Sequence, residues 1–322
     1  GAGLLTTTGT STVSSGGTLG MTRNWTNGGT INHTAGILQI RNGATLTNNA
    51  IYNANGGTQV SANGGTGVEY FLNAAAGQLN VNADFQVQPE QFDNAGTITV
   101  ASATTLSLGV TGTPVAGSQT GTWDFNDGTI RLASNNWVLG TGFNIASLVG
   151  AALNLDGGNL TNSTGGLVTL PANVTVSLNN NGSAIQGVDD IQIDGAFNWS
   201  AGTLAGAGLL TTTGTSTVSS GGTLGTTRNW TNSGTIDHTG GILQIRNGAT
   251  LTNDSIYNAA GGTAINTNGG VGVELFDNSA GAVFNVSSNI AIQPEQFIQD
   301  GTLSLNGGDV TITQLNNAGT LV

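Results

Sequence analysis

The chain has 322 residues, with 17 Asp and Glu against five Arg, no Lys and no Cys, and its net charge is −12. This acidity excludes binding to nucleic acid or to an anionic membrane through a basic patch, and no apolar run is long enough to predict membrane insertion of this segment. The hydrophobic fraction of 37% and the charged fraction of only 7% argue against ordinary disorder, which requires little hydrophobicity and high charge.

Short segments that alternate apolar and polar residues run along the whole chain, separated by Gly, Asn and Ser. This alternation predicts strands and turns and gives no sign of helices. The expected strands, in chain order up to the end of the unrepeated sequence, are Leu4–Thr7, Thr18–Leu19, Gly29–Asn32, Ile37–Ile40, Ala44–Thr47, Ala50–Tyr52, Val68–Phe71, Leu79–Val81, Phe85–Val87, Thr97–Val100, Trp123–Leu132, Trp137–Ile145, Leu153–Leu160, Leu167–Leu170, Val174–Leu178, Ile191–Ile193 and Phe197–Leu204. Pro114 and the Gly-rich run to Gly121 predict a protruding loop.

A long internal repeat organises the sequence. Residues 1–48 return at residues 206–253 with only four differences, and the register then continues without a gap to Gly96 and Gly301. The period is therefore 205 residues, which is far above the 20–50 residues of a single repeat unit. Each long block must consist of several smaller units.

The smaller unit is visible in a short phrase of Gly, Thr and an aliphatic residue, which recurs at spacings of 18–20 residues, for example at Gly202, Gly222, Gly301 and Gly319. Strands at this spacing leave no room for helices between them. The chain is therefore predicted to be all-β and to wind as a parallel β-helix, or β-solenoid, with about 18–20 residues per coil. At that coil length the segment would form roughly 16 or 17 coils.

One continuous β-solenoid is expected over residues 1–322, with the first long repeat block at 1–205 and the start of the second at 206–322. In such a fold each coil pairs its backbone with the coils on both sides, about 4.8 Å away. Aliphatic and aromatic side chains stack inside, and Trp25 and Trp230 are expected to fill or cap this core. Gly and Asn at the corners adopt left-handed backbone angles, and stacked Asn side chains form hydrogen-bonded ladders.

Three segments, Trp25–Ile31, Phe92–Ile98 and Leu315–Leu321, share an aromatic or aliphatic residue, then Asn, then Gly-Thr and an aliphatic residue. This form resembles the coils of bacterial β-helical surface adhesins of the filamentous-haemagglutinin-like and autotransporter-passenger type. The resemblance implies a right-handed parallel β-helix, secretion to the cell surface or beyond, and a role as a stalk or adhesive fibre. It brings no catalytic residues, and the secretion domain of that family is missing from this sequence.

Two carboxylates are duplicated with the long repeat. Glu90 and Glu295 each lie in the sequence Gln-Pro-Glu-Gln-Phe, where the Pro predicts a turn. A glycosidase needs a second acid at a defined distance, and in the first copy Asp84 and Asp93 are near in sequence. Their counterparts in the second copy are Asn and Ile, so a structural corner is favoured over a catalytic pair.

One histidine is also seen twice, as His33 and His238. Because there is no Cys and neither His lies in a cluster of carboxylates, a zinc or nucleophile site lacks partners, and both are predicted to be ordinary surface residues. Four arginines recur in the same way and are expected to pair with carboxylates or cover aromatic rings at the surface. They are Arg23, Arg228, Arg41 and Arg246.

The densest acidic group is Asp189, Asp190 and Asp194, which offers the hard oxygen ligands that Ca²⁺ prefers. Against a calcium site, the alternation of the strand places Asp190 and Asp194 on the face opposite Asp189. The calcium-binding nonapeptide of other β-rolls is also absent. These three residues are the metal candidates of the sequence, and calcium is the one cofactor considered.

Three functions are compatible with these patterns. The first is a non-enzymatic structural rod or stalk that supports adhesion at the bacterial surface, with further copies of the repeat in cis, lateral association of fibres and surface glycans or proteins as partners. The second is a carbohydrate-binding or polysaccharide-degrading β-helix, although the chain has no Lys. The third is an ice-binding solenoid, suggested by Thr6–Thr8 and Thr211–Thr213, although these triplets occur only once per long repeat.

Overall fold

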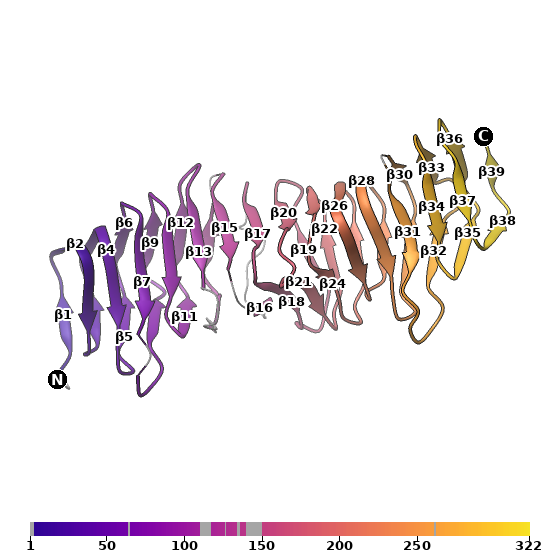
Figure 1. Cartoon of the computed structure of the whole chain (residues 1–322). Coiled ribbons are helices and arrows are strands. Elements are labelled where there is room, and N and C mark those ends of the chain that lie inside the picture. Colours follow the sequence, from indigo (N-terminus) through magenta and orange to yellow (C-terminus); the bar gives the residue numbers. More distant parts are fainter. Residues whose placement is uncertain are drawn as a thin grey trace. The chain divides into compact units, whose positions relative to one another are not determined.

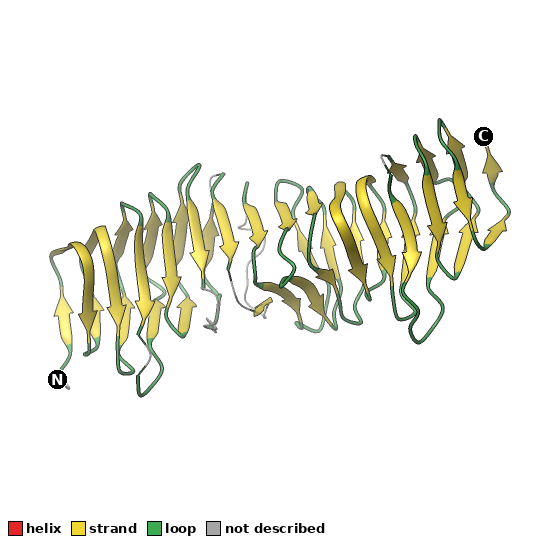
Figure 2. Cartoon of the chain, in the orientation of Figure 1, coloured by secondary structure: helices red, strands yellow, loops and turns green. Residues whose placement is uncertain are grey.

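The computed structural model describes residues 3–63, 65–109, 117–125, 127–133, 136–139, 150–260 and 262–322. These residues form strands, turns and loops and no helix (Figure 2). Every assigned strand pair is parallel, and the strands stack as a β-solenoid of about 14 turns, which confirms the predicted fold class. The handedness implied by the adhesin resemblance stays a prediction.

The chain divides into two compact units, Gly1–Asn159 and Leu160–Val322. This boundary differs from that of the blocks 1–205 and 206–322, which are defined by sequence identity alone. The loop predicted from Pro114 falls largely outside the described residues, as does most of the strand predicted at Trp137–Ile145.

The first unit contains the strands up to β17 (Figure 1). They are β1 (Leu5–Thr7), β2 (Thr10–Met21), β3 (Trp25–Asn27), β4 (Thr30–Ile40), β5 (Thr45–Asn48), β6 (Ile51–Ala54), β7 (Thr58–Ala62), β8 (Tyr70–Asn73), β9 (Gln78–Val81), β10 (Phe85–Gln88), β11 (Gln91–Asn94), β12 (Thr97–Val100), β13 (Thr105–Leu108), β14 (Thr122–Asp124), β15 (Thr129–Leu132), β16 (Asn136–Leu139) and β17 (Ala152–Leu155). Strand β18 (Asn159–Asn162) begins at the last residue of this unit.

The second unit contains the remaining strands. They are β19 (Val168–Leu170), β20 (Thr175–Leu178), β21 (Ala184–Gly187), β22 (Ile191–Ile193), β23 (Phe197–Trp199), β24 (Thr203–Leu204), β25 (Leu210–Thr212), β26 (Thr215–Thr226), β27 (Trp230–Asn232), β28 (Thr235–Ile245), β29 (Thr250–Asn253), β30 (Ile256–Ala259), β31 (Ala264–Thr267), β32 (Leu275–Asn278), β33 (Val283–Val286), β34 (Ile290–Gln293), β35 (Gln296–Gln299), β36 (Thr302–Leu305), β37 (Val310–Ile312), β38 (Leu315–Asn317) and β39 (Thr320–Leu321).

A complete coil contributes to three parallel ladders. In the first unit, β3, β5 and β8 belong to one ladder, while β6 and β7 belong to the two others. The long strand β4 bends across a corner, so its first half pairs with β6 and its second half with β7. In the second unit β28 bends in the same way and pairs with β30 and β31.

The coil is longer and more variable than the sequence phrase predicts. Ladder partners lie 18 residues apart at Phe297 and Leu315, but 27 apart at Val60 and Val87. The predicted 18–20 residues per coil therefore holds for only some coils, and about 14 turns form instead of 16 or 17. Some of the extra residues lie in corner loops, such as residues 65–69, which lead into β8.

The core is a narrow column of aliphatic and aromatic side chains. Leu46, Phe71 and Phe92 occupy successive ladder positions, and each is fully buried. Trp25 stands in the same column, where 7% of its surface is exposed, while Trp230 of the second unit is fully buried. The two tryptophans therefore fill the core, as one of the two predicted alternatives has it.

Corner geometry explains the frequent Gly and Asn residues. Asn42 and Gly43 have φ angles of 55° and 67°, and the repeated pair Asn247 and Gly248 has 54° and 70°. Side chains with a Cβ are strained at such angles, and Gly and Asn tolerate them best. The left-handed corners predicted from composition are therefore confirmed at these positions.

Candidate functional site

The duplicated histidine lies inside the coil, so the prediction of a surface residue was wrong. His33 and His238 are fully buried. His33 Nδ1 lies 2.7 Å from the Tyr52 hydroxyl and its Nε2 lies 3.1 Å from the carbonyl oxygen of Gly36. A carbonyl can only accept, so Nε2 carries the proton and Tyr52 donates to Nδ1. The second copy repeats the first contact, with 2.8 Å between His238 Nδ1 and the hydroxyl of Tyr257.

Burial keeps this pair uncharged. Desolvation lowers the pKa of His33 and lowers that of His238 to about 4, while the nearby backbone of the following turn opposes the shift. The same burial raises the pKa of Tyr52 and Tyr257. In the first copy the neutral imidazole of His33 is hydrogen-bonded at both ring nitrogens and joins two coils. In the second copy only Nδ1 of His238 is bonded, and its buried Nε2 has no hydrogen-bond partner among the described residues.

A buried ladder of side-chain amides runs through each unit, as predicted for stacked Asn. Asn27 donates to Asn48 at 2.8 Å, Asn48 to Asn73 at 2.8 Å, and Asn73 to Asn94 at 2.7 Å. All four residues are fully buried. The second unit has the corresponding ladder of Asn232, Asn253, Asn278 and Gln299. Each of these bonds joins adjacent coils, and the amides also cap backbone carbonyls of the next turn, for example Ile51 O.

Arg228 is the largest correction to the sequence analysis, because it is fully buried and was predicted at the surface. Its guanidinium donates to four backbone carbonyl oxygens of the preceding coils. They belong to Gly187, Ala205, Asp189 and Leu209. Desolvation lowers the pKa of Arg228, while the carboxylates of Asp190 and Asp189 oppose this effect.

Of the three metal candidates, Asp189 and Asp190 lie before β22, near Arg228, and Asp194 follows the other end of that strand. Asp189 accepts from Gly165 N at 2.8 Å, and Asp190 accepts from Leu209 N at 2.7 Å. Asp194 accepts from Gln192 Nε2 and from a threonine hydroxyl of the next coil, both at 2.7 Å. The carboxylates therefore fix turns between adjacent coils, and the nearby positive charge of Arg228 opposes a cation at Asp189 and Asp190. Calcium binding by these residues stays a prediction.

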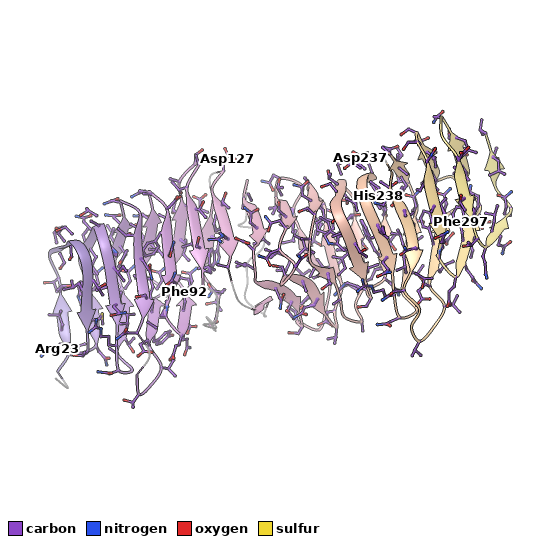
Figure 3. The ribbon with its side chains drawn as sticks, in the orientation of Figure 1. Arg23, Phe92, Asp127, Asp237, His238 and Phe297 are labelled. Atoms are coloured by element: carbon purple, nitrogen blue, oxygen red, sulfur yellow. The ribbon has the colours of Figure 1, made fainter. Side chains whose placement is uncertain are left out.

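Arg41 and Arg246 contact partners other than the predicted carboxylates or aromatic rings. Arg41 Nε donates to Gln39 Oε1 at 2.8 Å, and Arg246 Nε to Gln244 Oε1 at 2.7 Å. Each therefore pairs with the amide of a neighbouring strand residue and not with a carboxylate. Arg23 is exposed at the N-terminal end of the first unit (Figure 3).

The candidate glycosidase acids make corner contacts. Glu90 Oε2 accepts from Glu69 N at 3.3 Å, and Asp84 Oδ1 accepts from Thr105 N at 2.9 Å. Asp93 accepts from the Tyr70 hydroxyl and from a backbone N–H at residue 118. All three therefore join neighbouring coils through backbone or tyrosine donors, as expected for structural corners.

The sequence analysis missed one buried acid, which occurs in both copies. Glu69 and Glu274 are fully buried, and Oε1 of each faces the N–H of a corner glycine, Gly43 or Gly248, at 3.5 and 3.4 Å. The other oxygen, Oε2, has no hydrogen-bond partner among the described residues. The only available signal was that Glu69 precedes a strand whose alternation places it inside.

A shallow groove lies on the first unit, with a counterpart of similar volume in the second. Its volume is about 390 Å³, and outward side chains of successive coils line it, including Gln59, Gln86 and Arg131. Arg131 also forms an ion pair with Asp156. The corresponding groove of the second unit has Ala291 where the first has Gln86.

The threonine triplets extend into a short outward column. Thr211, Thr231 and Thr252 are ladder neighbours, but the next coil places Asp277 at this position. Thr212 instead points inward and accepts a hydrogen bond from Trp230 Nε1 at 3.0 Å. The column therefore extends over three coils only, and ice binding stays a prediction.

Among the described residues, no three His, Asp or Glu side chains gather closely enough to hold a metal ion. The same part of the chain has no helix that could span a membrane. Comparisons with family models, with curated proteins and with solved structures found no match to this chain. The resemblance to bacterial adhesin coils therefore rests on the sequence phrases and the solenoid fold.

Proposed function

We propose that the chain is a structural repeat region, in which added coils lengthen a rod that holds other groups at a distance. A parallel solenoid suits this role because each coil is bonded chiefly to its neighbours and stability is a sum of local contributions. Length can therefore grow without a larger core.

The observation that carries this proposal is the way in which the two copies have diverged. In the less similar part of the repeat the interior is retained, as at Phe71 and Phe276, which are both fully buried. Outward neighbours change their chemistry, as in Gln86 to Ala291 and Asp93 to Ile298. A binding or catalytic surface common to both copies would retain its outward groups. The two copies have instead kept the buried residues that the fold requires.

The setting of the proposed rod is the outside of a bacterial cell, where it would support adhesion as a stalk or fibre. Three features support this setting: the likeness of the coil phrases to adhesin coils, the absence of Lys and the absence of Cys. Few trypsin sites and no thiols suit a surface that meets proteases and oxidants. Surface glycans or proteins and neighbouring fibres are the proposed partners.

Electron microscopy and small-angle scattering of the purified chain test the rod directly. About 14 turns at 4.8 Å per coil predict a particle roughly 65 Å long. A variant with one additional 205-residue block should be longer in proportion to its added coils, with an unchanged cross-section. Equal lengths for the two proteins, or compact particles, would contradict the proposal. Binding of the chain to intact cells, compared with a chain of scrambled outward residues, tests the adhesive role separately.

A second candidate is carbohydrate binding, which the groove at Gln59, Gln86 and Arg131 favours. Two amides and a guanidinium offer donors and acceptors suited to sugar hydroxyls, and the groove continues along several coils. A glycan array should then show binding that is lost in Gln86→Ala. In the second copy both glutamines are replaced, Gln59 by Ala264 and Gln86 by Ala291, so its groove lacks these two amides. No retention of any glycan would remove this candidate.

A further inference from the structure

Two acidic residues are retained in both copies of the repeat, in a part where outward residues have diverged. The first copy has four acidic residues within residues 49–96. Only Glu69 and Glu90 return in the second copy, as Glu274 and Glu295, while the two others are replaced by Asn and Ile. The retained acids are therefore candidates for a role that the two copies share.

The two acids of a copy lie beside each other on adjacent coils. Gln91 N donates to Glu69 O at 3.0 Å, so Glu69 and Glu90 precede β8 and β11 at neighbouring ladder positions. In the second copy Gln296 N donates to Glu274 O at the same distance. Each acid lies two residues before a fully buried Phe, and strand alternation therefore directs its carboxylate toward the inside of the coil.

These inward carboxylates lack the partners that a buried charge requires. Glu69 and Glu274 are 0% exposed, and Oε2 of each has no hydrogen-bond partner among the described residues. In the second unit this holds although every residue of 262–274 is described. No Arg of the described chain forms an ion pair with either acid. Because adjacent coils are only about 4.8 Å apart, two inward carboxylates repel each other, and a cation between them would remove this repulsion.

The corner around each pair brings further oxygen atoms to the same place. Glu90 Oε2 accepts from Glu69 N at 3.3 Å, so its carboxylate lies against the backbone of the buried acid. Glu69 Oε1 lies 3.5 Å from Gly43 N, and the carbonyl oxygen of Thr66 lies 3.4 Å from where a Cβ on Gly43 would stand. In the second unit the carbonyl oxygen of Val271 approaches the corresponding glycine in the same way, at 3.3 Å. Calcium takes carboxylate and backbone carbonyl oxygens together, so two acids and a carbonyl-bearing loop provide suitable ligands.

We propose that each pair, Glu69 with Glu90 and Glu274 with Glu295, binds one calcium ion that joins two adjacent coils. Each pair with its corner is called a corner site below. Oxygen atoms from two coils and a loop form an irregular set, which calcium accepts, whereas Mg²⁺ requires nearly octahedral geometry. This inference goes beyond the proposed rod and does not depend on it.

The experiment titrates calcium chloride into the full chain after treatment with a chelator and dialysis. Isothermal calorimetry and native mass spectrometry should both show two ions per chain, one for each copy, and much weaker binding of magnesium. Amide hydrogen exchange at Gly43 and Gly248, which face Glu69 and Glu274, provides a local readout. At a free calcium concentration 100 times the Kd, the protection of these amides should rise on the order of 100-fold.

Three variants make the result specific. Glu69→Gln, which removes the charge but keeps the size of the side chain, should bind one ion instead of two. The double variant with Glu274→Gln should bind none. Asp84→Asn is the matched control and should still bind two ions, because the second copy has Asn289 at this position. Amide protection in β4 and β6 checks that the first unit remains folded in each variant.

Three outcomes would overturn the inference. If the folded wild-type chain takes up no calcium, a cation does not occupy the space between the carboxylates. If the double variant still binds two ions, the calcium lies at other acids and is adventitious. Equal affinity for magnesium would contradict the choice of ion. The length of the particles in electron microscopy is independent of all these results, so the corner sites and the proposed rod can fail separately.

Discussion

The Tyr52 hydroxyl lies 2.7 Å from His33 Nδ1 inside the coil, and the two residues occupy adjacent turns of the solenoid. Neither side chain has contact with solvent. The pair therefore ties one turn to the next through a neutral hydrogen bond that the second unit repeats at His238 and Tyr257. The free energy of unfolding should therefore depend on pH.

Lowering the pH from about 6.5 to about 4 should destabilise the second unit. The folded pKa of His238 is about 4, below its ordinary value of 6.5, so the unfolded state binds the proton first in this window. Stability is then complete above pH 6.5 and falls on the order of 3 kcal/mol as the pH drops to 4. Hydrogen exchange of β28 and β30 at several pH values measures this loss. His238→Gln should flatten the curve, and an unchanged slope would contradict the assignment.

Replacing an Asn of the buried ladder should lower the free energy of unfolding far more than replacing Asn53, which lies in a second, half-buried row of Asn side chains. Asn48→Ala removes the acceptor of one Asn27 N–H and the donor to Asn73 Oδ1 in the core, at about 2–4 kcal/mol. Asn53 also stacks between Asn32 and Asn80, at 2.9 Å on each side, but it is only half-buried. Asn53→Ala should therefore cost less than about 1 kcal/mol.

Local opening free energies from hydrogen exchange of β3, β5 and β8 compare these two variants. Exchange is preferred over a single melting temperature because a repeat array opens in parts. Equal losses for Asn48→Ala and Asn53→Ala would show that burial does not decide the energy of the ladder.

Arg228→Met and Arg23→Met form a matched pair at the same place in the repeat. Arg228→Met removes the donor for four buried carbonyl groups and should destabilise β25 and β27 by about 3–5 kcal/mol. Arg23 is exposed, and Arg23→Met should change stability by less than about 0.5 kcal/mol. Urea titrations of the two variants, monitored by amide hydrogen exchange near residues 23 and 228, measure both losses of stability. A loss of stability in Arg23→Met as large as that in Arg228→Met would contradict the exposed position of the Arg23 side chain.

Asp277→Asn should stabilise the protein at neutral pH. Burial, followed by the charges of Asp300 and Asp254, raises the pKa of Asp277, so its ionised form is disfavoured in the folded state. The gain should be below about 1 kcal/mol because the side chain is only half-buried. It should diminish in acid, because the raised pKa lets Asp277 take up its proton before the unfolded chain does. Thermal unfolding of the wild type and the variant at pH 7 and pH 4 tests this. Asp300→Asn should give a smaller gain of the same sign.

Strand alternation predicts the fold class and also places some polar residues inside the coil. Ile31 and His33 are two residues apart in β4, so both side chains point to the same face, and both are fully buried. The same rule places Glu69 inside, two residues before Phe71. The polarity of His33 alone suggests a surface position, but a buried polar group is tolerated when it is hydrogen-bonded.

Other features depend on neighbours that are distant in the sequence. The burial of Arg228 requires Gly208, one coil earlier, and carbonyls near residue 187, two coils earlier. The Gly-Thr phrase predicts the pairing of Thr302 with Thr320 correctly, but Thr203 pairs with Gly225 and not with Thr223. No local pattern reveals such shifts, because bulges and corner loops decide them.

The Asn ladder also determines which insertions and deletions the gene can tolerate. Asn27, Asn48, Asn73 and Asn94 are separated by 21, 25 and 21 residues, yet each amide meets the next at nearly the same distance. The loop that leads into β8, which includes residues 65–69, accommodates the added length of the second interval. Mutations that add or remove residues in that loop, or whole coils anywhere, keep every amide in line. An indel within a strand would displace one amide and break the line on both sides of it.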